Sequence, residues 1–182
     1  MNSINKNQEE KNHQDLNPAA AVEKIKELTG IAKTCFLTTQ ESVSPTSTPS
    51  KGTRPMSVQQ TDDHGNLWFL VANDSHTYAD ISANPEVKLY FQGSAHSDFL
   101  YLEGTAALSA DKAKISELWD PILKTWFTEG EDDPRIAVIK VKPVDGYFWD
   151  NKHGNVVAGI KVAVGAIIGK TLDDSIEGDL KL

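Results

Sequence analysis

The sequence is poor in cysteine, in positive charge and in long apolar runs, and each shortage excludes a class of protein. Cys35 is the single cysteine among 182 residues, so no disulfide can form within the chain. Eighteen Lys and Arg against 26 Asp and Glu give a net charge of −8, which argues against a nucleic-acid-binding surface. No apolar run approaches the roughly 20 residues that cross a bilayer, and the polar N-terminus has no signal-peptide core. We therefore expect a cytoplasmic protein without nucleic-acid or membrane partners.

Motifs for metal binding, nucleotide binding and nucleophilic catalysis are also absent. No histidine is paired with another histidine or with the cysteine at helical or finger spacing, so we expect no metal site. The sequence contains no Gly-x-x-x-x-Gly-Lys, no Gly-x-Gly-x-x-Gly and no Gly-x-Ser-x-Gly. Cys35 lies in an apolar stretch and is interpreted as a small buried hydrophobe. No residue can be nominated as a catalytic acid or base.

The composition and its changes along the chain predict one domain with two additions. With 39% hydrophobic residues the chain can build one core. Residues 1–16 are polar and almost lack apolar side chains, which predicts a disordered tail. Residues 17–151 form the expected domain. Residues 152–182 are an extension with one further strand, for which the apolar run 160–168 is the candidate.

The periodicity of apolar residues predicts a mainly β domain with flanking helices. Asn17 and Pro18 suit the start of a first helix and Gly30 its end. Shorter helices are expected at 75–83 and 111–119, and Gly104 is expected to mark a bulge or a close backbone contact. Strands are expected at 33–39, 54–60, 67–72, 87–92, 99–108, 136–141 and 146–149. So many short strands indicate a closed or sandwiched β domain.

One group of residues has the chemistry of a phosphate site. Arg54 opens a strand, and Asn-Asp-Ser-His-Thr (73–77) stands at a helix start. A helix N-terminus offers free N–H groups and the positive end of the helix dipole. The Ser75 hydroxyl and a bidentate arginine could complete such a site. The alternative is that Asp74 or Ser75 only caps the helix and that Arg54 is a surface charge.

Several segments in this order resemble the flavin-binding split barrels of the pyridoxamine 5′-phosphate oxidase-like superfamily. These are Arg-Pro-Met (54–56), Leu-Trp-Phe (67–69), Ser-x-x-x-x-Asp-Ile-x-x-Asn-Pro (75–85) and Phe-Leu-Tyr-Leu-Glu-Gly (99–104). Leu-Trp-Asp-Pro (118–121), Trp-Phe-Thr-Glu-Gly (126–130) and Asp-Asp-Pro (132–134) are similar to its general-stress-protein branch. The resemblance implies a six-stranded split β-barrel. It also implies a homodimer that binds two flavin mononucleotides (FMN) at its interface.

The resemblance also implies roles for individual residues. Arg54 and Ser75 match the family's phosphate-binding positions. The residues that match positions beside the flavin ring are Met56, Ser57, Phe69, Leu70 and Val71. The residues that stand where the oxidases have basic side chains are Gln59, His76 and Thr77, so weaker flavin retention is expected. The Arg-rich C-terminal motif of the true oxidases is absent, and a vitamin-B6 oxidase is not expected.

The leading hypothesis is therefore an FMN-binding general stress protein that acts as a flavin-dependent oxidoreductase or handles flavin. The cofactor would carry the redox chemistry, and the protein would bind and orient it. A second hypothesis is a non-enzymatic dimeric module that keeps the barrel but has lost flavin, which the departure at Thr77 favours. A third is a related split barrel that uses a deazaflavin or haem.

Overall fold

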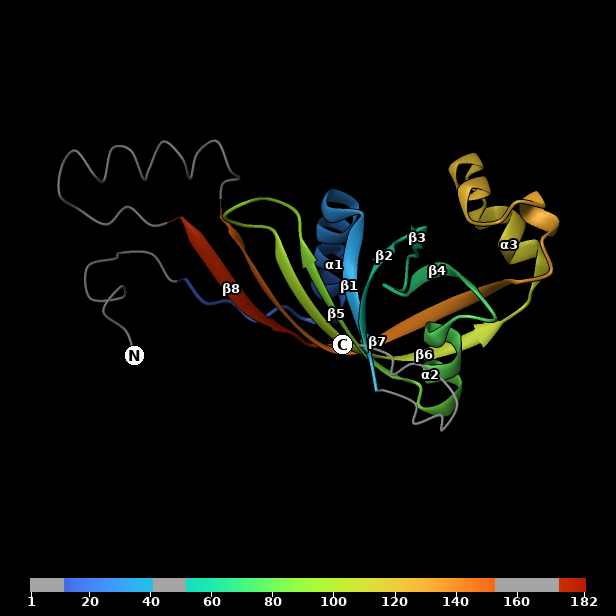
Figure 1. Cartoon of the computed structure of the whole chain (residues 1–182). Helices are drawn as coiled ribbons and strands as arrows, with labels where there is room; N and C mark the ends of the chain where they lie inside the picture. Colours follow the sequence, from blue (N-terminus) through green and yellow to red (C-terminus); the bar gives the residue numbers. More distant parts are fainter. Residues whose placement is uncertain (1–11, 41–51, 153–173) are drawn as a thin grey trace.

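The structure, a computed structural model, describes residues 12–40, 52–152 and 174–182 (Figure 1). The helices are α1 (Pro18–Ala32), α2 (His76–Ala83), α3 (Lys112–Leu118) and the 3₁₀ turns η2 (Pro121–Thr125) and η3 (Gly130–Asp132). The strands are β1 (Thr34–Thr39), β2 (Thr53–Ser57), β3 (Gln60–Thr61), β4 (Leu67–Ala72), β5 (Glu86–Gln92), β6 (Phe99–Ser109), β7 (Ile136–Asn151) and β8 (Ser175–Leu180). The expected mainly β fold with flanking helices is confirmed.

The strands form one strongly curled antiparallel sheet that closes on itself. Their order is β2-β1-β5-β6-β7-β4-β3, and β8 pairs with β7. The two strands at the ends of this order, β2 and β3, follow each other in the chain, and only Val58 and Gln59 lie between them. Val58 N donates to Lys33 O beside β1, and Gln59 N donates to Trp68 O on β4. One extended stretch therefore joins both ends of the sheet into a split barrel. The described residues hold eight strands, two more than the expected six, because the stretch 53–61 divides and β8 is added.

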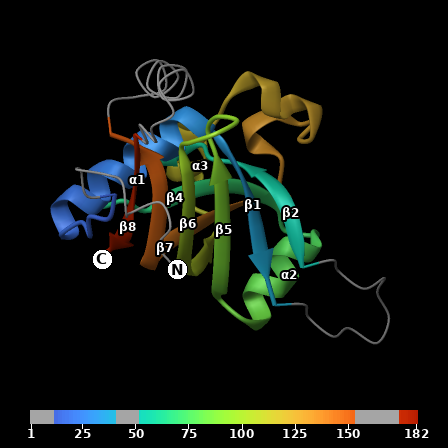
Figure 2. The same cartoon turned by 90° about the vertical axis from the view of Figure 1, so that its left-hand side faces the viewer.

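The inner face of the sheet and helix α1 build the main core. In β1 the side chains alternate, so that Cys35 and Leu37 are buried while Phe36 points outward. Ile25 and Leu28 of α1 are fully buried in the same cluster. Helices α1 and α2 lie at opposite ends of the strands in both views (Figures 1 and 2). Within the described residues, no helix is long and apolar enough to span a membrane.

Helix α1 begins as expected but ends later. The Asn17 side chain accepts a hydrogen bond from Ala20 N, and Pro18 occupies the first turn. The expected end at Gly30 is wrong, since the helix continues to Ala32. Lys33 supplies the left-handed cap with φ 57° and donates its N–H to Thr29 O. A glycine is favoured at such a cap but is not required for it.

The expected strands at 136–141 and 146–149 are one 16-residue strand, β7. Pro143 lies between the two expected strands and has no N–H to donate to a sheet. The register between β6 and β7 shifts where Glu103 pairs with Asp145 and Gly104 pairs with Pro143, which leaves Val144 as an extra, exposed residue. This bulge accommodates the proline. A Cβ on Gly104 would lie 2.8 Å from Lys142 O, so the expected close contact at Gly104 is confirmed.

A second apolar cluster covers part of the outside of the barrel. The segment from α3 through η3, here called the arm, packs over β4 and β7. Because β4 is buried on both faces, its outward residue Leu70 enters this cluster while Phe69 enters the main core. The buried residues of the second cluster are Leu70, Ile115, Leu118, Leu123, Phe127, Ile136 and Val138.

Residues 12–16 run beside the last strand. His13 pairs with Glu177 and Leu16 with Leu180, both in parallel bridges. The approach is close at Gly178, where a Cβ would lie 2.1 Å from Gln14 O. The first eleven residues of the expected tail and the apolar run 160–168 lie outside the described residues, so the proposed domain limits stay a prediction.

Candidate functional site

The candidate site is built around Arg54, on the edge strand β2. In β2 the side chains alternate, and Arg54 and Met56 lie on the side that faces the core. Arg54 Nη1 donates to Thr77 Oγ1 at 2.9 Å, and its Nη2 lies 3.1 Å from Asp80 Oδ2. The structure therefore brings the strand residue Arg54 against the first turns of α2. We call this group of Arg54, Ser75, Thr77 and Asp80 the arginine corner.

Asp80 is the one member of this corner to which the sequence analysis had assigned no role, although it lies in a segment that carries the family resemblance. Its side chain has no exposed surface. Besides Arg54, Thr39 Oγ1 donates to the same Oδ2 oxygen at 2.8 Å. A buried carboxylate needs such partners, because an unpaired charge away from water is very costly. The interpretation of Arg54 as a mere surface charge is therefore incorrect, since its side chain is only 20% exposed.

The start of α2 supplies further hydrogen-bond donors. Ser75 is the N-cap, and its Oγ accepts a hydrogen bond from Tyr78 N at 3.2 Å. The Ser75 hydroxyl proton can therefore point outward. As in any helix, the N–H groups of the first turn have no partner within the helix itself. Thr77 is buried, and His76 is exposed beside it.

The residues expected beside a flavin ring lie in different surroundings. Met56 is half-buried against the main core, and Ser57 is exposed at the end of β2. The side chains of Phe69 and Val71 are enclosed in the main core, and Leu70 is enclosed under the arm. Only the backbone of β4 could therefore meet a ligand. The structure unites Arg54 with Thr77 and the start of α2, and it does not bring Phe69, Leu70 and Val71 to a surface.

The outer face of the sheet carries a groove that the sequence had not predicted. Pro55, Phe36, Tyr90, Tyr101 and Tyr147 follow one another across five neighbouring strands, and we call this row the aromatic row. Phe36 is 56% exposed and Tyr90 46%. The groove has a volume of about 670 Å³, and the aromatic residues that line it are Phe36, Tyr90, Phe91, Phe99, Tyr101 and Trp149.

A polar triad lies at the side of this groove. Tyr101 donates a very short hydrogen bond to Glu103, and Lys88 Nζ lies 2.8 Å from Glu103 Oε1. The hydrogen bond from Lys88 and the one from Tyr101 lower the pKa of Glu103. Desolvation and the bond to Glu103 raise the pKa of Tyr101. The triad is thus a charged pair with a neutral phenol, and it offers no group that titrates near neutral pH.

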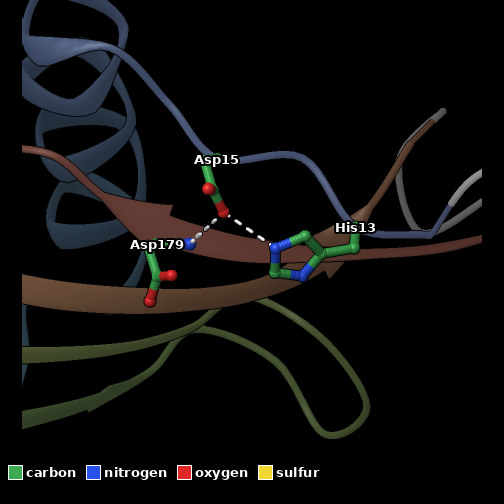
Figure 3. Close-up of side chains that lie close together, drawn as sticks. All are labelled: His13, Asp15 and Asp179. Carbon is green, nitrogen blue, oxygen red and sulfur yellow. Dashed lines mark hydrogen bonds and ion pairs between the residues drawn. The ribbon is translucent and has the colours of Figure 1, made fainter.

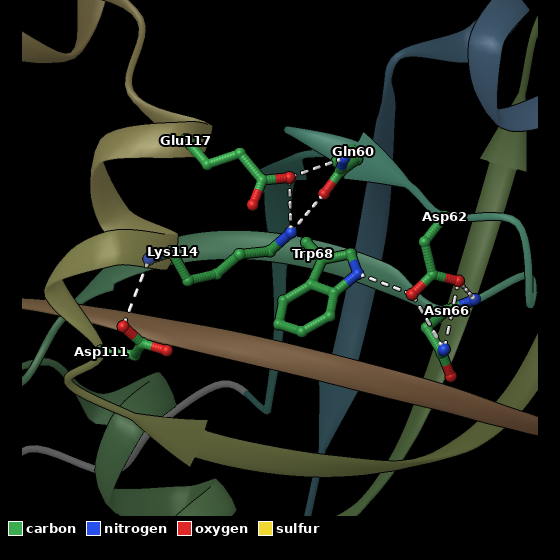
Figure 4. A network of polar contacts seen from close by, with 7 residues as sticks. All are labelled: Gln60, Asp62, Asn66, Trp68, Asp111, Lys114 and Glu117. Carbon is green, nitrogen blue, oxygen red and sulfur yellow. Dashed lines mark hydrogen bonds and ion pairs between the residues drawn. The ribbon is translucent and has the colours of Figure 1, made fainter.

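A second polar network fastens the arm to the barrel (Figure 4). Lys114 Nζ donates to Gln60 Oε1 at 2.6 Å and lies 2.8 Å from Glu117 Oε1. The same ammonium lies 4.2 Å from the centre of the Trp68 ring, a cation–π contact. Trp68 Nε1 donates to Asp62 Oδ2 at 3.0 Å. These contacts join α3 of the arm to β3 and β4 of the barrel, so the network has a structural role.

Three potential metal ligands lie close together where residues 12–16 run beside β8 (Figure 3). His13, Asp15 and Asp179 are exposed, and their ligand atoms lie within 4.8 Å of one another. The Asp15 carboxylate accepts from Asp179 N at 3.3 Å and lies 2.8 Å from His13 Nε2. The backbone hydrogen bond lowers the pKa of Asp15 most strongly. These bonds hold residues 12–16 on β8 and account for the cluster without an ion.

Cys35 behaves as the sequence predicted. Its side chain is 4% exposed. Burial raises the pKa of its thiol to about 12. A thiol in this state is a poor nucleophile.

Comparison with known proteins gives this geometry a context. The sequence matches the model of a family described as "Pyridoxamine 5′-phosphate oxidase like" over residues 20–173. Protein bli-3 of Neurospora crassa is 29% identical over 126 residues, which cover 64% of this chain. The match spans 60% of the length of bli-3.

Solved structures share the fold. A candidate general stress protein 26 of Jannaschia sp. CCS1 superposes with a TM-score of 0.72 at 20% identity, over 90% of this chain and 99% of that one. The General Stress Protein 26 of Bacillus anthracis gives 0.56 at 23% identity, over 70% and 92% of the two chains. The general stress FMN/FAD binding protein of Xanthomonas citri gives 0.55 at 23% identity, over 69% and 84%.

Proposed function

Because the chain belongs to the pyridoxamine 5′-phosphate oxidase-like family, we propose that it is a flavin-binding general stress protein whose cofactor is FMN. The observation that carries this proposal is the arginine corner, where Arg54 meets the first turn of α2 at 2.9 Å. A structural relative of the same fold is a general stress FMN/FAD binding protein. The proposal assigns the corner to the cofactor's phosphate.

The donors of the corner suit a phosphate group. The Arg54 guanidinium, the Ser75 hydroxyl and the first N–H groups of α2 come from two elements and converge on one end of the barrel. His76 is exposed next to them. The flavin ring would then lie along β2, where Met56 and Ser57 follow Arg54, and beside the backbone of β4.

The same proposal includes a homodimer. Pro55 lies between Arg54 and Met56 on β2 and belongs to the aromatic row. Arg54 points to the core-facing side of the edge strand β2 and Pro55 to its outer side, so a ligand held at Arg54 lies across this edge from the exposed aromatic face. Tyr, Trp and Phe are enriched at protein interfaces. A second copy packed on this face would cover Phe36 and Tyr90 and would place the flavin at the interface.

The role of the chain's own side chains in this proposal is to bind and orient the flavin. A bound flavin supplies electron or hydride transfer. Arg54 and Ser75 would hold the phosphate end of the flavin. The backbone of the enclosed strand β4 would limit how far the flavin ring enters the barrel. His76 and Asp74 are exposed titratable side chains beside this end of the barrel, and the proposal assigns neither of them a proton-transfer role. The activity is accordingly proposed as a flavin-dependent oxidoreductase or a flavin-handling protein, and not as a vitamin-B6 oxidase.

Titration of the purified protein with FMN, followed by quenching of flavin fluorescence, tests the proposal. We expect saturable binding near micromolar or tighter, weakened at least tenfold in Arg54→Ala because a charge-assisted contact is lost. Arg54→Lys keeps the charge and should weaken binding less. Lys26→Ala, which removes a surface lysine paired with Asp63, should leave the affinity unchanged. No saturation up to about a millimolar would overturn the proposal.

One observation favours a second candidate, a dimeric binding module without flavin. Arg54 is already bound to the buried carboxylate of Asp80. This ion pair reduces the positive charge and the N–H donors that Arg54 can offer to a phosphate. A colourless protein that remains dimeric and does not bind FMN would support this candidate. Absorbance bands of a deazaflavin or a haem in the purified protein would instead point to another cofactor in the same barrel.

A further inference from the structure

At its β7 end the aromatic row meets a second ring. The centroids of the Tyr147 and Trp149 rings are 4.6 Å apart, and the two planes are tilted by 51°. Trp149 is 43% exposed and lines the aromatic groove. On β6, Phe99 pairs with Trp149 and Tyr101 pairs with Tyr147, so two further rings of the groove lie next to them. We call Tyr147 and Trp149 the ring pair.

Carboxylates border the ring pair on its other side. Glu177 of β8 pairs with Trp149. Asp179 pairs with Tyr147, and residues paired in this way project from the same face of a sheet. Asp15 lies beside Asp179 (Figure 3). Desolvation, and after it the negative charges of Glu177, Asp179 and Asp15, raise the pKa of Tyr147. The charges of three carboxylates therefore act on the ring pair.

The basic side chains printed at this end of the sheet pair with Asp15. Lys181 Nζ lies 3.3 Å from one Asp15 oxygen, and the His13 imidazole lies 2.8 Å from the other. Within residues 12–40, 52–152 and 174–182, no Lys or Arg forms an ion pair with Glu177 or Asp179. In this part of the chain the negative charge of β8 beside the ring pair is therefore not offset by a neighbouring cation.

We propose that the ring pair and its carboxylates bind a small organic ammonium ion. The negative faces of aromatic rings attract a cation, and quaternary ammonium ligands are recognised in this way. Glu177 and Asp179 add charge complementarity, and they repel an anion. The apolar substituents of the ammonium lie along Phe99 in the groove, whose volume of about 670 Å³ suits a small molecule.

The same molecule contains an internal example of this contact. Lys114 Nζ lies 4.2 Å and Lys140 Nζ 5.1 Å from the centre of the Trp68 ring. The ring pair offers comparable faces to a cation from outside. The site is distinct from the proposed flavin site, because it lies on the outer face of β7 and Arg54 lies on the core-facing side of β2.

Titration of the full-length protein with choline, and with the uncharged isostere dimethylbutanol in which carbon replaces the nitrogen, tests this inference. The indole N–H signals of the four tryptophans report binding by NMR. Choline should shift the Trp149 signal saturably, with a dissociation constant of about a millimolar to ten millimolar. Dimethylbutanol should bind at least about tenfold more weakly. Equal binding of the two, or no saturable Trp149 shift up to about 100 mM choline, would overturn the inference.

Variants locate the site, with calorimetry of benzyltrimethylammonium binding as the readout. Trp149→Leu keeps an apolar side chain but removes the ring, and should weaken binding at least about tenfold. Glu177→Gln keeps the size but removes the charge, and should weaken binding at least about threefold. Trp126→Leu, at an exposed tryptophan of the arm, is the matched control and should change nothing. Unchanged binding in Trp149→Leu would refute the site. Binding that appears only in the double variant Phe36→Ser/Tyr90→Ser would also refute it, because a second copy would then occupy the ring pair.

Discussion

The two outer surfaces of the barrel differ in what covers them. Over β4 and β7, the arm buries Leu70, Val138 and Ile136 against Leu118 and Phe127. Over β1, β5 and β6 the same sheet leaves the aromatic row open to solvent. The chain thus covers one apolar face by itself and leaves the other exposed. The covered face contributes to folding, and the open face is available for association.

The side chains of the two faces suit these different tasks. The covered face uses aliphatic residues and Phe127, which have no polar atoms to satisfy. The open face uses Tyr90, Tyr101 and Tyr147, whose rings carry a polar hydroxyl, and the hydroxyl of Tyr101 is already bonded to Glu103 and Lys88. Tyr90 and Tyr101 also stack on each other, with ring centres 5.2 Å apart. An open face built this way stays hydrated in the free chain and loses little when it is covered.

The largest effect is expected on the covered face. Phe127→Ala should lower the free energy of unfolding by about 3–5 kcal/mol, because a buried ring leaves a cavity. Its neighbour Trp126 is 62% exposed, so Trp126→Ala should change stability by no more than about 0.5 kcal/mol. Urea unfolding of both variants measures the difference. A loss below about 1 kcal/mol for Phe127→Ala would mean that the arm does not fold with the barrel.

An intermediate effect is expected on the open face. The double variant Phe36→Ser/Tyr90→Ser should weaken the proposed dimer at least tenfold, since exposed aromatics at an interface centre often dominate its affinity. The free energy of unfolding of the double variant's monomer should change little. Ile122→Ser removes a side chain that is 66% exposed on the arm and serves as the matched control. Sedimentation velocity over a range of concentrations measures association. A double variant as dimeric as the wild type would exclude this face as the interface.

The smallest effect concerns acid sensitivity, and it should again differ between the faces. Hydrogen bonds from Arg135 hold the pKa of Asp133, at the end of the arm, below its usual 3.8. A lowered pKa in the folded state gives stability that is present above pH 3.8 and is lost as the pH falls below it. Asp133→Asn should therefore lower the Tm at pH 7, and the difference from wild type should shrink in acid.

The counterpart on the open face is Glu103, whose pKa is lowered from 4.5 chiefly by Lys88. Because Lys88 is 51% and Glu103 39% exposed, solvent screens this pair. Glu103→Gln should shift the Tm less than Asp133→Asn at pH 7, and thermal melts from pH 7 down to pH 2.5 compare the two. A larger shift for Glu103→Gln would show that the polar triad, not the arm, controls acid sensitivity.

Local sequence signals gave most of the elements of the fold. Asn17 caps α1 as predicted, and Asp111 caps α3 at the start of the helix expected at 111–119. Asp62 accepts hydrogen bonds from His64 N and Asn66 N in the turn between β3 and β4. Each of these features depends on residues close together in the chain. The limit of the prediction was reached at β7, where Pro143 is accommodated by a strand that precedes it by some 40 residues.

The candidate site was only partly predictable for the same reason. The start of α2 and Arg54 were identified from residue chemistry and the family resemblance. Asp80 was not, because nothing local shows that this position of α2 faces β2, 26 residues earlier. The aromatic row needs the register of five strands at once. Residue spacing in one strand places Tyr90 on a face, but only the pairing with Phe36 and Tyr101 joins them into a surface.

The parallel pairing of residues 12–16 with β8 has a consequence for biosynthesis. Asp15 and Asp179, which share a hydrogen bond, are 164 residues apart. At about 5–20 residues per second, the ribosome completes β8 many seconds after residues 12–16 have emerged. In the last part of that time, after β7 itself has been made, residues 146–151 at its outer edge have no partner until β8 follows. Such an edge can pair with other chains, so a chaperone bound to the nascent barrel would act mainly in this interval.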